Sequence, residues 1–197
     1  MGAMELPQLA QEVLDFWFGA PGSAEFGHVR DLWFRKDPAF DALLSTRFTD
    51  LHEAAARGEL TAWEAAPESL LALIVVLDQF PRNIHRGLAA SFATDRAALA
   101  AARVMLDSAW DLALPPAMRW FAYMPFEHSE SLADQDLCLQ LMQRVADDPR
   151  FSDVPRWADA HRAVIARFGR FPHRNAILGR ESTPAEADFL TQPGSSF

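Results

Sequence analysis

The stretch Pro67-Glu68-Ser69-Leu70-Leu71-Ala72-Leu73-Ile74-Val75-Val76-Leu77-Asp78-Gln79-Phe80 decides the fold class. It is apolar nearly all round a helical wheel, and such a helix is buried by neighbours on several sides. The β-branched run at 74–76 would also suit a strand, but helical punctuation lies at both ends and no partner strand occurs elsewhere. We therefore predict a central helix from Glu68 to about Phe80 in an all-α protein.

Outward from this helix, proline starts, glycine stops and capping side chains predict further helices joined by short loops. Short loops favour antiparallel neighbours, so we predict about eight helices stacked in antiparallel pairs. We expect one domain over residues 5–197 and exclude residues 1–4 as a cloning remnant. The predicted helices are about 7–18, 38–57, 68–80, 95–110, 116–124, 132–145, 155–168 and a short one from 184.

Local signals predict how these helices begin, end and face the core. Pro125 is expected to end the fifth helix, and Leu9, Leu43 and Trp157 are expected on inward faces. The predicted capping residues are Asp37, Thr61-x-x-Glu64, Thr94, Ser131-x-x-Asp134 and Thr183-Pro184-x-Glu186.

The composition excludes several classes of protein. The net charge of −9 argues against broad binding of nucleic acid or of an anionic membrane surface, because both need a basic face. The longest apolar run, Leu70 to Leu77, is too short to span a bilayer. The single cysteine, Cys138, excludes an intramolecular disulfide and is predicted to be an inert core thiol. We expect a soluble, cytoplasmic protein.

One basic island stands out in this acidic chain. Residues 160–180 contain five arginines, two histidines and no acid, so the rest of the chain carries 13 basic and 27 acidic residues, a balance of −14. Such an island needs buried carboxylates to pair with or an anion to bind. Its centre, Phe171-Pro172-His173-Arg174-Asn175, resembles Phe80-Pro81-Arg82-Asn83, which lies 91 residues earlier. This likeness suggests a repeated helix-turn unit, although the segments are too short to establish duplication.

Asp78 occupies a position where the helical period demands a hydrophobe. It lies in register with Leu71, Ile74 and Val75, and Arg82 follows one turn later. A buried carboxylate costs several kcal/mol unless it is paired, so Asp78 needs a cationic or N–H partner. Two readings stay open: a structural ion pair that ties helices together, or a carboxylate that orients a catalytic or ligand-binding cation.

Two histidines lie among predicted helix ends and apolar stripes. Glu127 and His128 follow Pro125, where they either cap the next helix or act as an acid–base pair. His161 lies on the stripe of Val164 and is either a hydrogen-bonded core residue or part of a site. With Asp78 these residues would supply enough metal ligands, but no His-x-x-x-His or Cys-x-x-Cys spacing supports a metal, so we predict neither a metal nor a cofactor.

Four segments together resemble the bacterial domain-of-unknown-function family 924. The likeness covers residues 5–197 and implies an all-α fold similar to tetratricopeptide-repeat superhelices, with no established activity. The segments that carry it are Val13-Leu14-Asp15-Phe16-Trp17-Phe18-Gly19, Leu77-Asp78-Gln79-Phe80-Pro81-Arg82-Asn83, Met124-Pro125-Phe126-Glu127-His128-Ser129-Glu130, and Arg167-Phe168-Gly169-Arg170-Phe171-Pro172-His173-Arg174-Asn175 with Leu178-Gly179-Arg180.

These observations predict one partly enclosed polar pocket. The leading hypothesis is a site for a small anionic molecule or the carboxylate end of a peptide, because the arginine island exceeds the acids expected near it. A second hypothesis is a hydrolase or lyase that uses Glu127 and His128 as acid and base. A third is a structural polar core in a protein-interaction module, marked by exposed Trp33, Trp110 or Trp120. The expected pocket residues are Asp78, Arg82, Glu127, His128, His161, Arg170, His173, Arg174 and Asn175. The sequence leaves the oligomeric state open.

Overall fold

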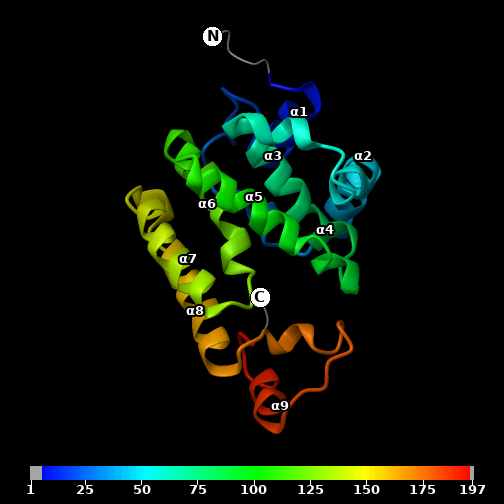
Figure 1. The fold of residues 1–197 in the computed structure, drawn as a ribbon, viewed down its shortest axis with the longest axis vertical. Helices are drawn as coiled ribbons and strands as arrows, with labels where there is room; N and C mark the ends of the chain where they lie inside the picture. The colour runs from blue at the N-terminus through cyan, green and yellow to red at the C-terminus, as the bar shows by residue number, and fades with distance from the viewer. Residues whose placement is uncertain (1–5, 196–197) are drawn as a thin grey trace.

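The computed structural model describes residues 6–195, and all regular secondary structure among them is helical (Figure 1). The prediction of an all-α protein is thereby confirmed, while the proposed cloning remnant at residues 1–4 lies outside the described residues. Short 3₁₀ turns join the α-helices. The helices are α1 Gln8–Phe18, α2 Pro38–Ala56, α3 Pro67–Asp78, α4 Phe80–Ile84, α5 Asp95–Asp107, α6 Pro116–Glu127, α7 Leu132–Val145, α8 Val154–Phe168 and α9 Pro184–Leu190.

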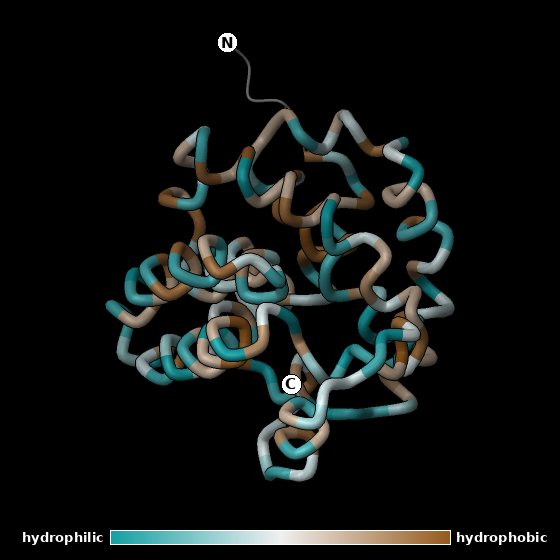
Figure 2. The backbone as a smooth tube through the Cα atoms, turned by 60° about the horizontal axis from the view of Figure 1, so that its bottom comes forward, coloured by the Kyte–Doolittle hydropathy of each residue, from teal (hydrophilic) through white to brown (hydrophobic). Residues whose placement is uncertain are grey.

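Helix α3 lies at the centre of the fold, as its composition predicts. It is buried from Ser69 to Asp78 and packs against α1, α2, α5 and α6. Figure 2 shows hydrophobic residues gathered in the interior of this part, with hydrophilic ones along the periphery. Each fully buried Leu, Ile or Val side chain contributes roughly 1.5–3 kcal/mol, so α3 anchors the whole arrangement. The polar residue at its end, Asp78, is fully buried with it.

A second layer is formed by α6, α7 and α8, each packed against the next (Figure 1). This packing of successive helices is compatible with the tetratricopeptide-like arrangement that the family resemblance implies. After α8 the chain turns at Gly169 and runs below the helices of Figure 1, where its last helix is α9. A small apolar cluster of Val164, Ile165 and Phe171, covered by Phe168 and Phe189, attaches this C-terminal segment.

Three of the predicted caps are present and two are not. Asp37, Ser131 and Thr183 each accept a hydrogen bond from a backbone N–H in the first turn of the next helix, and Thr183 forms a full capping box with Glu186. The predicted box at Thr61 was wrong, because 61–65 is a 3₁₀ turn without a side-chain cap. Thr94 does not cap α5 either: its hydroxyl donates to the carbonyl of Leu77 at 2.6 Å and ties α5 to α3.

The predicted helix end at Pro125 was also wrong. Helix α6 continues to Glu127, and the N–H of His128 donates to the carbonyl of Met124 at 3.0 Å. Proline removes only one hydrogen bond, whereas ending the helix there would expose Phe126, which is fully buried. The extra turn sets the position of His128 at the helix C-cap.

Some residues predicted to face the core lie on the surface. Leu9, Leu43 and Trp157 are 52, 50 and 49% exposed, because they stand at the edges of their helical stripes. By contrast Trp33 and Trp120 are buried and stack edge-on at 6.3 Å, so they do not form the exposed aromatic patch expected of a protein-interaction module. Among residues 6–195, no helix combines the length and the apolar character needed to cross a bilayer.

Candidate functional site

Two similar short turns bring two arginines to one carboxylate. Each contains a proline that directly follows a fully buried phenylalanine: helix α4 begins with Phe80-Pro81, and the 3₁₀ turn Pro172–Arg174 follows Phe171. Arg82 Nη1 lies 2.9 Å from Asp95 Oδ1, and Arg174 Nη1 lies 3.3 Å from Asp95 Oδ2. Residues 92 positions apart thus meet at the start of α5.

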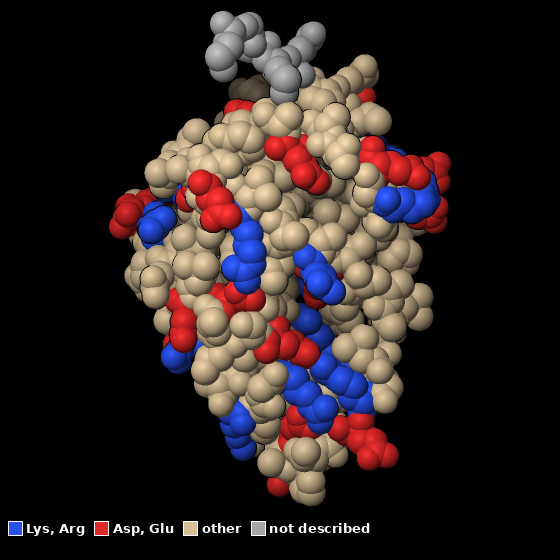
Figure 3. Space-filling view, viewed as in Figure 1, with Lys and Arg blue, Asp and Glu red and all other residues tan. Residues whose placement is uncertain are grey.

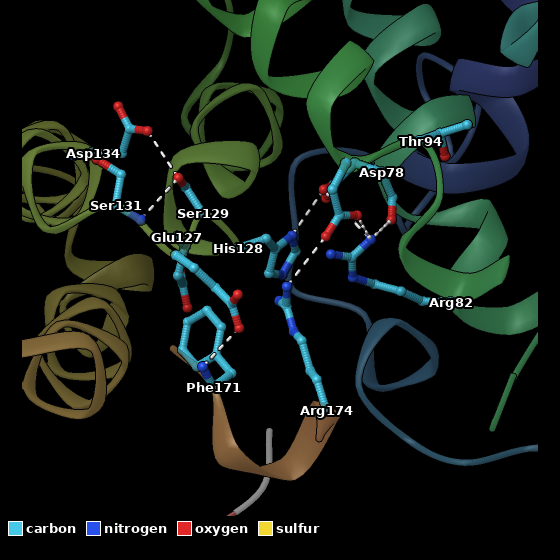
Figure 4. Close-up of polar contacts among 12 residues, drawn as sticks. Asp78, Arg82, Thr94, Glu127, His128, Ser129, Ser131, Asp134, Phe171 and Arg174 are labelled. Carbon is cyan, nitrogen blue, oxygen red and sulfur yellow. Dashed lines mark hydrogen bonds and ion pairs between the residues drawn. The ribbon is translucent and has the colours of Figure 1, made fainter. Parts of the chain in front are cut away.

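Asp78 is the buried anchor of the site. Its side chain is 0% exposed, and its Oδ1 accepts a hydrogen bond from Nδ1 of His128 at 2.8 Å (Figure 4). Gln79 donates to Oδ2 at 2.5 Å, and Arg82 Nη1 lies 3.5 Å from Oδ1 and donates to the Asp78 carbonyl. Burial alone would raise the pKa of Asp78, but the charge of Arg82 and the contact with His128 outweigh it and hold that pKa well below its usual range. Asp78 is therefore an anion that fixes three cationic or N–H groups.

The two guanidinium groups keep buried donors without protein acceptors. Within residues 6–195, Arg82 Nη2 and Arg174 Nε are buried and have no hydrogen-bond partner. Arg174 is held between the rings of Phe92 and Phe171, 4.6 and 4.5 Å from their centroids. Burial lowers the pKa of Arg174 to about 10, with Asp95 opposing the effect and Arg82 adding to it. A further acceptor would therefore be favourable beside this pair.

Glu127 and His128 belong to two separate pairs, although they are adjacent in sequence. Glu127 Oε1 lies 2.9 Å from Nδ1 of His161, and the same nitrogen lies 2.9 Å from the carbonyl of Trp157. His128 contacts Asp78 instead, and the rings of His128 and His161 are 6.5 Å apart. The amide of Gln135 donates to the Glu127 carbonyl at 2.6 Å and holds this end of α6. The acid partner of His128 is thus Asp78.

Three histidines surround this region, and burial affects two of their pKa values. Burial, reinforced by Arg174, lowers the pKa of His173 to about 4. Burial and then Arg82 lower the pKa of His128, against the opposing effect of Asp78. Both rings are therefore neutral at pH 7. In the described part of the chain, no three His, Cys, Asp or Glu side chains gather closely enough to hold a metal ion.

The other basic residues of the C-terminal segment serve as anchors. Arg170 binds Glu186 through two nitrogens at 2.7 and 2.8 Å, and Asn175 donates to the same carboxylate at 3.4 Å. Arg180 binds Glu130 in the same bidentate way, at 2.7 and 2.9 Å. Arg170 and Asn175 therefore contact the α9 region, whereas Arg174 reaches the Asp78–Asp95 network.

The positive excess expected of the arginine island is largely neutralised. Arg162 pairs with Asp136 at 2.5 Å, in addition to the three pairs made by Arg170, Arg174 and Arg180. Arg167 stacks on Phe168, with its guanidinium carbon 4.6 Å from the ring centroid. An anion would consequently be bound by the donors of Arg82 and Arg174 that have no partner within residues 6–195, and not by a net positive charge of the island.

The site is partly exposed to solvent. Arg82 and Asp95 are each 20% exposed and His128 is 12% exposed at the side chain. Figure 3 shows basic groups gathered in a hollow between the helical layers and the C-terminal segment, with acidic groups beside them. Asp95 and Phe92 were missed by sequence reasoning. Asp95 follows Thr94 at the start of a helix, where an acidic residue ordinarily interacts with the helix dipole. No local signal therefore distinguished that role from pairing with arginines.

The fold and these segments define a member of a bacterial family of proteins of unknown function, DUF924, which matches residues 13–194. The chain belongs to this family. It is similar to a solved structure, the protein of unknown function ATU0120 from Agrobacterium tumefaciens, with 43% sequence identity and a TM-score of 0.80. The likeness covers 92% of this chain and 96% of the other. None of the curated proteins matches the chain.

Proposed function

We propose that the protein binds a small molecule or peptide end through a carboxylate or phosphate group. The observation that carries the proposal is the pair of buried guanidinium donors, Arg82 Nη2 and Arg174 Nε, which lack protein acceptors among residues 6–195. The two guanidinium groups come from different turns, and each is fixed through its Nη1 on the shared carboxylate of Asp95. Two guanidinium groups arranged in this way are suited to an oxyanion, because each presents N–H donors in a rigid plane.

The energetics favour such a ligand. A buried donor without an acceptor costs roughly 1–3 kcal/mol, and a charge-assisted hydrogen bond to an anion removes that cost. Because the cluster of Arg82, Arg174, Asp78 and Asp95 is neutral overall, a single added negative charge meets two guanidinium groups and no net repulsion. The lowered pKa of Arg174 has the same physical origin, since burial and Arg82 disfavour its positive charge and an anion would restore it.

Three further expectations belong to this proposal. The net charge of −9 supports a small ligand in place of nucleic acid. The single cysteine, Cys138, is buried in the core, which is consistent with a reducing, cytoplasmic location. The packing of α6, α7 and α8 supports the tetratricopeptide-like description.

The test is thermal unfolding with orthophosphate and with acetate at matched ionic strength. A ligand at 100 times its Kd stabilises a protein by about 2.7 kcal/mol, which shifts Tm by several degrees. We expect stabilisation of the native protein that is lost in Arg174→Gln and retained in Arg162→Gln, a control that removes a partly buried arginine of the same island whose partner is Asp136. Identical shifts in all three proteins, or no shift with either anion, would overturn the proposal.

A further inference from the structure

The tautomer of His128 is fixed by its partner. The ionised carboxylate of Asp78 accepts only, so Nδ1 of His128 carries the hydrogen of the 2.8 Å contact. In the neutral ring Nε2 is then a proton acceptor. Within residues 6–195, the His128 side chain forms no hydrogen bond other than the one to Asp78. An acid that orients a histidine and leaves its second nitrogen available is the arrangement of a general base.

The basic nitrogen of His128 belongs to the same charged cluster as the two arginines. His128 Nδ1 and Arg82 Nη1 contact the same oxygen of Asp78, at 2.8 and 3.5 Å, and Arg82 and Arg174 share the carboxylate of Asp95. Figure 4 shows the His128 ring between Asp78 and the guanidinium of Arg174. A ligand held by Arg82 and Arg174 would therefore lie within reach of this base. The other groups near the ring are His161, whose ring centroid is 6.5 Å away, His173, whose pKa responds to the charge of His128, and Gln79, which donates to Asp78.

The arrangement favours direct removal of a proton from the ligand. A serine or cysteine nucleophile would have to bond to the histidine, and none of residues 6–195 does so. A histidine removes a proton from carbon only when the resulting negative charge is stabilised on oxygen. Two guanidinium groups meet both needs of a 2-oxo carboxylate, because one binds the carboxylate and the other stabilises the enolate oxygen.

We propose that this site, acting on the anion of the proposed function, removes a proton from C3 of a small 2-oxo carboxylate. The C3–H bond breaks, its proton goes to Nε2 of His128, and its electron pair forms the C2–C3 double bond while the carbonyl electrons move to the oxygen. Asp78 stabilises the imidazolium that forms. The reverse step returns a proton to C3, so no oxidant, reductant or second substrate is consumed.

The test is exchange of the C3 protons of 2-oxobutyrate for deuterium in D2O, followed by ¹H NMR in an amine-free buffer. We expect the native protein to accelerate exchange over buffer and Arg162→Gln to match it. His128→Gln should lose at least about 100-fold of the acceleration, which is the lower range for general base catalysis. Asp78→Asn should slow the reaction and shift its pH profile, since Asp78 acts on the ring and does not touch the ligand.

The outcomes separate this inference from the proposed function. Stabilisation of the native protein by 2-oxobutyrate in thermal unfolding, together with exchange at the buffer rate, would overturn proton removal and leave anion binding standing. Absence of both would overturn both. Equal exchange by the native protein and by His128→Gln would show that His128 is not the base.

A second measurement needs neither turnover nor a variant that folds. Diethyl pyrocarbonate acylates neutral imidazole at an accessible nitrogen, and mass spectrometry locates the modified residue. We expect modification of His128 that slows when 2-oxobutyrate is present, while the exposed His28 reacts at the same rate with and without it. A His128 that stays unmodified, or whose rate ignores 2-oxobutyrate at concentrations that stabilise the protein, would contradict the placement of Nε2 toward the ligand.

Discussion

The two Phe-Pro turns are built on the same plan. In each, a buried phenylalanine precedes a proline, an arginine reaches Asp95, and an asparagine follows the arginine. The asparagines are anchored alike: Asn83 shares the carboxylate of Asp41 with Arg86, and Asn175 shares that of Glu186 with Arg170. The two similar sequence segments are therefore anchored by the same kinds of contact.

The two turns differ in one added residue and in how deeply the arginine is buried. The second turn inserts His173 before its arginine, and Arg174 is only 8% exposed against 20% for Arg82. Burial would lower the pKa of Arg82, but Asp78 and Asp95 raise it above its usual value, whereas the pKa of Arg174 falls to about 10. Arg82 is thus largely satisfied by protein carboxylates, and Arg174 is the cation that gains most from a ligand.

The largest effect is expected from removing the anchor of the first turn. Asp78→Ala leaves Arg82 and His128 buried without their anion, and breaking a buried pair in this way costs about 3–5 kcal/mol. Urea unfolding measures the loss. Asp95→Asn, at a carboxylate that is partly exposed, should cost clearly less; an equal loss would mean that both turns depend on Asp95 for stability.

The inserted His173 should make stability depend on pH. Its pKa is about 4 in the folded protein and about 6.5 when unfolded, so between these values the unfolded chain binds more protons. Its contribution is complete above pH 6.5 and is lost as the pH falls toward 4, by at most about 3 kcal/mol.

Urea midpoints between pH 7 and pH 4.5 test this pH dependence. His173→Gln should flatten the decline, whereas His28→Gln, which removes an exposed histidine, should leave it unchanged. An unaltered slope in His173→Gln would mean that His128 or the carboxylates govern the acid sensitivity.

The two asparagine anchors should differ by the number of hydrogen bonds they make. Asn175 is fully buried and bonds to Ser182, Glu186 and Arg180, whereas Asn83 makes one bond, to Asp41. At roughly 1 kcal/mol per bond, Asn175→Ala should cost about 2–3 kcal/mol and Asn83→Ala about 1 kcal/mol. Calorimetric unfolding of the two variants gives the comparison directly. Equal losses would show that the second turn is held by its apolar contacts instead.

Local sequence patterns predicted the structural features that depend on residues close together in the sequence. The period of residues 67–80 predicted both the central helix and the inward position of Asp78, because helical geometry fixes which residues share a face. The same logic failed at Pro125, where burial of Phe126 in the finished fold outweighed a local helix breaker. Tertiary context decided the outcome there.

The partners within the site could not be predicted from sequence. Asp95 meets Arg82 and Arg174 across separations of 13 and 79 residues, and nothing in the sequence around Asp95 specifies those distances. Glu127 stands next to His128 in sequence but turns to His161, since successive residues of a helix point about 100° apart. Pairings across the fold depend on helix packing, which a single sequence does not encode in any short pattern.

The smallest effect concerns how the chain enters the second turn. Gly169 ends α8 at φ +70°, whereas Gln79 precedes the first turn at an ordinary φ of −91°. Space for a methyl group is open at Gly169, so Gly169→Ala should cost only the backbone strain, about 1 kcal/mol, in urea unfolding. Gly87→Ala, at φ +80° and equally open, is the matched control after the first turn.

Phosphate stabilisation of the two glycine variants then sharpens the comparison. If Arg174 is the cation that gains most from a ligand, Gly169→Ala should weaken phosphate stabilisation. Relief of the backbone strain at residue 169 would shift the second turn and move Arg174 relative to Asp95. Gly87→Ala should leave phosphate stabilisation intact, since Arg82 is held by Asp78 as well as by Asp95. A loss confined to Gly87→Ala would reverse the roles of the two arginines.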